Sequence, residues 1–128
     1  MEPPTAFARA QYEAAGDLDG TFGVQGPQIT SFPDYAGAPA LTVALHADGD
    51  ITAAGAASKN YSSDVAVATY DLQGVPDLDG YPVQRFTAYY ADNGVTLFLA
   101  SVLQPDGKLV AAGRVWNGLD YDFLVARF

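Results

Sequence analysis

The chain has 128 residues, a formal net charge of −9 and no cysteine, and 49% of its residues are apolar. This length allows one domain with a modest core, and the apolar content excludes a wholly disordered chain. Only six basic residues are present, so binding to nucleic acid or insertion into a membrane is not expected, and the lack of cysteine excludes disulfides and thiol chemistry.

The sequence repeats itself with an offset of 58 positions. A fixed period of this length is typical of an array of supersecondary units. It divides the single domain into unit 1 (about 7–64), unit 2 (about 65–122) and the start of a third unit (123–128). The matching pairs are Asp48-Gly49 with Asp106-Gly107, Ala53-Ala54-Gly55 with Ala111-Ala112-Gly113, Asp64 with Asp122, and Val67-Ala68 with Val125-Ala126.

The first element in chain order, within Thr5–Ala15, has two interpretations. Its alanine content favours a helix by intrinsic propensity. The repeat instead places Phe7–Tyr12 on Val65–Tyr70, which has the pattern of a strand. We expect an extra N-terminal strand here, because the register compares like with like and propensity is a weak prior.

Four β-like segments then recur in each period, and we expect each set of four to form one antiparallel sheet. The first set is Gln28–Phe32, Leu41–His46, Asp50–Ala57 and Val65–Tyr70, and the second is Val83–Ala88, Thr96–Leu103, Lys108–Val115 and Phe123–Phe128.

Hydrophobic patterning predicts which faces are covered. Leu41, Val43 and Leu45 alternate with smaller or polar residues, which predicts one better-buried face. Leu97–Ala100 and Leu109–Ala112 are apolar on both faces, as in strands between two layers.

The strongest turn signal is Pro105-Asp106-Gly107, in which proline presets φ and glycine takes a positive φ. His46–Asp50 has the same turn without the proline. The Ala-Ala-Gly triplets that follow both turns are expected to let neighbouring sheets approach closely.

These elements predict an all-β fold with two propeller-type, four-stranded antiparallel sheets and an extra N-terminal strand. Two such sheets do not close a ring, since propellers need about four or more, and they would leave open edges. Three explanations remain: a fragment of a longer array, a protomer that closes a ring with other copies, or a two-sheet sandwich. We therefore expect a protein partner or self-association through exposed sheet edges.

Three runs follow a recognisable pattern. Gly16–Gly23 fits G-x-L-D-x-x-F-G, and Gln104–Gly113 fits Q-P-D-G-K-[IL]-V-x-A-G. Asp122–Phe128 fits D-F-x-L-A-R-[YF] except that Val125 replaces the leucine. With these motifs the chain resembles, over nearly its whole length, the delta-60 repeat family of bacterial β-propeller-like proteins. Gly74–Pro82 departs from the pattern by lacking the Phe-Gly ending, and the first turn lacks Gln, Pro and Lys. The resemblance implies a secreted or cell-surface protein and supplies no catalytic residues.

Enzymatic chemistry has little support in the sequence. His46 is the only histidine, and Gln104 occupies its position in the other copy. We therefore interpret His46 as a polar strand-end residue and not as a general base. No phosphate-binding loop is visible, and we expect neither an enzyme nor a cofactor.

Two Asp-Leu-Asp-Gly runs are weak candidates for a metal site. Carboxylates at alternate positions before a glycine are typical of the start of a calcium loop, but the further ligands and the closing glutamate are missing. We expect a structural turn with a buried leucine, and calcium remains the alternative. The candidate ligands are Asp17, Asp19, Asp77 and Asp79.

The best candidate binding loop is Trp116–Tyr121. Aromatic rings beside amide and carboxylate groups suit contacts with a sugar or a peptide. We nevertheless favour the interpretation in which the tryptophan folds over an exposed sheet face. The candidate residues are Trp116, Asn117, Asp120, Tyr121 and Tyr61.

The sequence thus predicts a non-enzymatic structural or protein-interaction module. The alternative is a carbohydrate- or peptide-binding module, with or without calcium.

Overall fold

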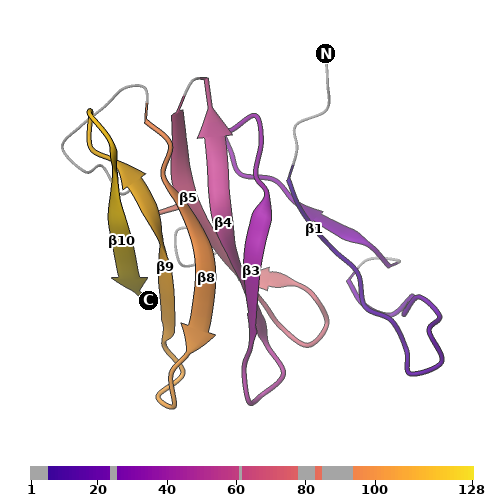
Figure 1. Ribbon diagram of the computed structural model, residues 1–128. Helices are drawn as coiled ribbons and strands as arrows, with labels where there is room; N and C mark the ends of the chain where they lie inside the picture. Colours follow the sequence, from indigo (N-terminus) through magenta and orange to yellow (C-terminus); the bar gives the residue numbers. More distant parts are fainter. Residues whose placement is uncertain (1–5, 24–25, 61, 78–82, 85–93) are drawn as a thin grey trace.

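The computed structural model describes residues 6–23, 26–60, 62–77, 83–84 and 94–128. Within these ranges all regular structure is β (Figure 1), which confirms the all-β fold class. No helix in them is long and apolar enough to span a membrane. The strands are β1 (Phe7–Arg9), β2 (Gln28–Thr30), β3 (Ala40–Leu45), β4 (Ile51–Lys59), β5 (Ser62–Tyr70), β6 (Pro76–Asp77), β7 (Val83–Gln84), β8 (Leu97–Leu103), β9 (Leu109–Trp116) and β10 (Tyr121–Arg127).

The strands form three antiparallel sheets. β1 and β2 make the N-terminal sheet, and β8, β9 and β10 make the C-terminal sheet in the order β10-β9-β8. The central sheet has the order β3-β4-β5, with β6 and β7 both paired to β5. Figure 1 shows β1 on one side of the central sheet and β8–β10 on the other.

The N-terminal segment contains a strand, as the repeat register predicts. Phe7–Arg9 pairs with β2 in the register Phe7↔Thr30. The chain then turns back through an isolated bridge between Tyr12 and Leu18. The alanine content of this segment is overridden because β2 offers backbone partners and a buried position for Phe7.

Sheet boundaries do not follow the sequence period, so the prediction of one self-contained sheet per period is wrong in this respect. The first segment of each period joins the preceding sheet: β2 pairs with β1, and β7 pairs with β5. Short turns hold the other three segments together as hairpins. The first segment has only a long connection on its C-terminal side, so it pairs with whichever strand edge lies beside it. The remainder of the expected strand Val83–Ala88, after Gln84, lies outside the described residues.

The two hairpin turns of the repeat have the same geometry. The His46 amide donates to the Asp50 carbonyl at 2.8 Å, and the Gln104 amide donates to the Lys108 carbonyl at 2.8 Å. Each turn contains a glycine at positive φ, a conformation that strains any other residue. These glycines are Gly49 (96°) and Gly107 (83°).

The described residues form two core clusters, one on each face of the central sheet. The cluster facing the N-terminal sheet contains Phe7, Phe32, Ala38, Ala57, Ala66, Ala68 and Tyr70. The cluster facing the C-terminal sheet contains Ala44, Ala54, Val65, Phe98, Leu109 and Ala111, with Val67, Leu103, Leu124, Ala126 and Phe128 packed against it.

The predicted burial of β3 is reversed in the structure. Val43 and Leu45 are 66% and 69% exposed, whereas Ala44 between them is buried. The small side of the strand packs on the C-terminal sheet. The side of β3 that carries Val43 and Leu45 lies on the same face of the sheet as Ala53, the register partner of Val43. The two-stranded N-terminal sheet does not extend over these two side chains.

The described residues also cover only one face of the C-terminal sheet. Leu109 and Ala111 are buried, but Leu99 and Val102 are exposed. The expectation that these strands lie between two layers is therefore wrong for the outer face of this sheet.

Each Ala-Ala-Gly triplet places its glycine at a β-bulge. A Cβ on Gly55 would lie 2.1 Å from the Pro39 carbonyl oxygen, and one on Gly113 would lie 1.9 Å from that of Leu97. The register shifts at the same two points. The glycines therefore allow neighbouring strands of one sheet to approach, and not neighbouring sheets as the sequence analysis predicts.

Candidate functional site

Trp116 and Tyr121 face each other across the end of the β9–β10 hairpin. They are register partners, so both rings belong to strand ends and not to the loop. The rings pack edge to face with centroids 5.1 Å apart, and the Arg114 guanidinium lies 4.2 Å from the Tyr121 centroid. A Cβ on Gly94 would come within 2.9 Å of the Trp116 Cβ. The tryptophan is thus packed against its own fold.

The polar groups of this turn bond to one another. Asn117 Oδ1 accepts from the amides of Leu119 and Asp120 at 2.8 and 2.9 Å. Its Nδ2 donates to Asp120 Oδ1 at 2.6 Å and to Asp122 Oδ2 at 2.9 Å. Both donors and the acceptor of the amide are therefore engaged in closing the turn. The structure brings together four of the five predicted residues, and Tyr61 lies outside the described residues. A ligand site here stays a prediction.

Asp19 caps its own turn. Its Oδ1 accepts from the Thr21 amide at 2.8 Å and from the Thr21 hydroxyl at 2.5 Å. These hydrogen bonds stabilise the charged carboxylate and lower the pKa of Asp19 from its ordinary value. This arrangement is the structural turn that the sequence predicts.

The leucine between the two aspartates is not a buried plug. Leu18 is 43% exposed, because the Tyr12–Leu18 bridge places it at the edge of the turn. Asp17 and Asp19 do not gather with a third ligand, since the described part of the chain holds no group of three acidic or histidine side chains able to bind a metal. In the second run, the side chain of Asp77 and all of Asp79 lie outside the described residues.

His46 follows β3 directly, and its side chain hydrogen-bonds to a pair of threonine hydroxyls. Its Nε2 lies 2.8 Å from Thr52 Oγ1, which lies 2.9 Å from Thr69 Oγ1 on the next strand. The position matches the prediction of a polar strand-end residue.

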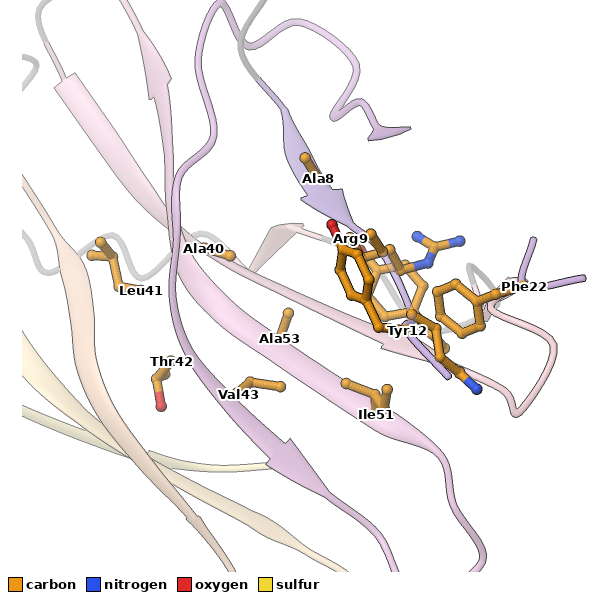
Figure 2. Close-up of a pocket in the computed structure, with 13 residues that line it drawn as sticks. Ala8, Arg9, Tyr12, Phe22, Ala40, Leu41, Thr42, Val43, Ile51 and Ala53 are labelled. Carbon is orange, nitrogen blue, oxygen red and sulfur yellow. The ribbon is translucent and has the colours of Figure 1, made fainter. Parts of the chain in front are cut away.

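Sequence reasoning missed a hollow beside β1. It has a volume of about 520 Å³ and lies against the uncovered face of β3 and β4 (Figure 2). Its lining includes Arg9, Tyr12, Phe22, Leu41, Val43 and Ile51.

Arg9 is held at this hollow by an aromatic ring and two acceptors. Its guanidinium lies 3.8 Å from the Tyr70 centroid and donates to Thr30 Oγ1 at 3.0 Å and to the Gly74 carbonyl. Its Nε is buried with no hydrogen-bond partner, and burial lowers the pKa of Arg9. One signal could have revealed the site, because the repeat has valine at both equivalent positions, Val67 and Val125.

The comparisons with known proteins add one finding. A family model described as a domain of unknown function (DUF5122) beta-propeller matches residues 104–128. These residues contain β9 and β10, which form two thirds of the C-terminal sheet. The match supports a propeller-like repeat for this part of the chain. No curated protein matches the chain.

Proposed function

We propose that this chain is a non-enzymatic structural or protein-interaction module of a bacterial surface or secreted protein, built from β-propeller-type repeats of the delta-60 kind. The observation that carries this proposal is the outer face of the C-terminal sheet. Phe123 and Val125 project from β10 on one side of the sheet, and Val102 projects from β8 on the same side; all three are exposed. A contiguous exposed apolar face is typical of a protein-interaction surface.

The non-enzymatic part of the proposal is supported by how the polar candidates are used. The imidazole of His46 bonds to a threonine on β4, and the Asp19 carboxylate closes a turn. His46 lines a hollow between the two hairpin turns, and Asp19 does not line the hollow beside β1. Their positions fit a scaffold in which polar side chains stabilise turns and strand ends.

The surface location rests on the resemblance to the delta-60 repeat family, and the acidic composition is compatible with it. Thirteen of the fifteen acidic residues are aspartate, which is favoured in turns. The resulting net charge of −9 keeps a repeat protein with open apolar faces in solution.

The hairpin at Asn117 gives little support to sugar recognition. Sugar sites depend on amide and carboxylate groups directed at the ligand, whereas the Asn117 amide is engaged within the turn. We therefore propose no second function.

Sedimentation equilibrium over a range of concentrations, combined with a glycan array, tests this proposal. We expect discrete oligomers, or a complex with a protein partner, in the absence of any small ligand. A chain that is monomeric at every concentration and binds a glycan would contradict the proposal and favour the lectin-like alternative.

A further inference from the structure

Three strands of the molecule occupy the same position in successive copies of the repeat. Phe7 on β1, Val65 on β5 and Phe123 on β10 are each 58 positions apart. Phe7 and Val65 are 2% and 0% exposed, and each packs on the sheet that follows it, whereas Phe123 is 98% exposed. The repeat therefore predicts that a following sheet covers Phe123.

Other residues on the outer face of the C-terminal sheet also correspond, at the same offset of 58, to buried residues of the central sheet. On the central sheet, Ala44 and Ala54 face the C-terminal sheet together with Val65. Their counterparts 58 positions later are Val102 and Ala112, which lie on the exposed outer face. This outer face is thus a second copy of a surface that the chain already buries once.

The complementary surface is exposed at the other side of the molecule. Leu103 of β8 packs into the cluster between the central and C-terminal sheets. Its counterpart Leu45, on β3, is exposed, as is Val43, the counterpart of Ser101. The chain therefore presents both halves of an interface that it forms internally, and the two halves lie on opposite sides (Figure 1).

β1 covers only part of this complementary surface. It is the counterpart of β10, but the described N-terminal sheet contains no counterpart of β8 or β9. The hollow of about 520 Å³ lies beside β1 and over Leu41, Val43 and Ile51 (Figure 2). This is where the repeat places the strands that would accompany β10.

β1 is also a weaker occupant of its position than β10. The β1–β2 ladder has three residue pairs, whereas β10 forms seven pairs with β9. Arg9 on β1 holds a buried, unpartnered Nε, which is costly in a poorly solvated position. The counterpart of Arg9 on β10 is Val125, which carries no charge to desolvate.

We propose that a second copy of this chain docks the outer face of its C-terminal sheet onto the exposed face of β3 and β4, with its β10 replacing β1 beside β2. The exchange continues the interface between the central and C-terminal sheets from one molecule to the next. The two surfaces differ, so the association is head to tail, and it forms a ring or an open chain according to the rotation between copies. This inference rests on the proposed function, and it identifies the protein partner as a second copy of the chain. Because each copy carries a net charge of −9, salt strengthens the association by screening repulsion.

The face is tested with two matched variants of the full chain. Phe123→Asp places a charge on the docking face, and Leu119→Asp places the same charge at another strongly exposed apolar residue, in the turn between β9 and β10. Neither side chain is buried, so both variants should fold, and circular dichroism confirms this. By sedimentation equilibrium, Phe123→Asp should weaken self-association by about tenfold or more, and Leu119→Asp should leave it unchanged.

The exchange is tested by locking β1 in place. Ala8 and Ile29 are register partners in the β1–β2 ladder, at a separation that a disulfide can span. The chain has no other cysteine, so the double variant Ala8→Cys with Ile29→Cys forms a single defined bond. The oxidised variant should be monomeric, and reduction should restore association.

Each contrary result has a distinct meaning. Association of the oxidised variant at wild-type strength would overturn the exchange. Equal association of Phe123→Asp and the wild type would overturn the docking face while leaving the proposed function standing. A wild-type chain that never self-associates would overturn this inference, and the proposed function would then rest on a different protein partner.

Discussion

The central and C-terminal sheets are built from equivalent residues, yet they have opposite surroundings. Val65 is fully buried against the C-terminal sheet, and its counterpart Phe123 is almost fully exposed. Both positions carry apolar side chains at equivalent points of β5 and β10, in successive copies of the repeat. The difference shows that burial in this molecule is decided by the neighbouring sheet and not by the local pattern, as expected for a repeat protein in which each unit is stabilised by its neighbours.

The largest expected loss of stability concerns the glycine β-bulge that the central and C-terminal sheets share. Gly55→Ala and Gly113→Ala each place a methyl group against a backbone carbonyl, so each variant should lose about 2–3 kcal/mol of stability. Urea unfolding measures this loss. Gly20→Ala is the control, because a Cβ there meets nothing within 4 Å. If all three variants were equally stable, the bulges would not be the point of close approach.

The next largest loss of stability concerns the feature in which the two sheets differ, the burial of Val65 and the exposure of Phe123. Val65→Ala removes two methyl groups from a filled core and should cost about 2 kcal/mol. Phe123→Ala should change the stability of the dilute chain by no more than about 0.5 kcal/mol. Thermal unfolding of both variants at low concentration gives the comparison. A large loss in Phe123→Ala under these conditions would mean that the outer face is covered within one molecule.

A smaller effect is expected at the end of the C-terminal sheet. Trp116→Ala removes an edge-to-face pair with Tyr121 and should lower stability by about 1 kcal/mol. Leu119→Ala, in the same turn but fully outside the ring pair, should have no measurable effect. An unchanged melting temperature for Trp116→Ala, together with loss of a glycan or peptide contact, would favour the predicted binding loop.

The smallest effect concerns pH and the N-terminal turn. Hydrogen bonds from Thr21 lower the pKa of Asp19 in the folded chain. The stability that this carboxylate contributes is therefore present above its ordinary pKa and is lost as the pH falls through the lower, folded value. An NMR titration of the carboxyl carbon should show the lowered pKa in the wild type and in Thr21→Ser, which keeps the hydroxyl. Thr21→Ala should raise it, and an identical titration in all three proteins would assign the shift elsewhere.

Local features of the fold were predictable because short-range chemistry decides them. Gly107 and Gly49 require positive φ in their turns, and Asp106 follows a proline that presets the turn. The positions of the hairpin strands follow directly from these turns. The strand at Phe7 was also predictable, because the repeat supplies a comparison that propensity lacks.

Long-range features were not predictable by the same means. The sequence of β2 does not determine that it pairs with β1 and not with β3. The partner of an edge strand depends on which other strand edge lies unpaired beside it in the folded chain. The exposure of Leu45 likewise depends on how far the N-terminal sheet extends. The position of Arg9 could have been noticed, since a charge there departs from Val67 and Val125.

The way strands are shared between sheets limits how this chain divides into portable pieces. β7 belongs by sequence to the second set of four segments but closes the edge of the central sheet, and β2 belongs to the first set but closes the edge of the N-terminal sheet. A fragment excised along the 58-residue period would lose the last strand of one sheet and carry a stray strand of another. The segment that keeps every strand of the central sheet begins with β3 and ends after β7, out of phase with the repeat that encodes it.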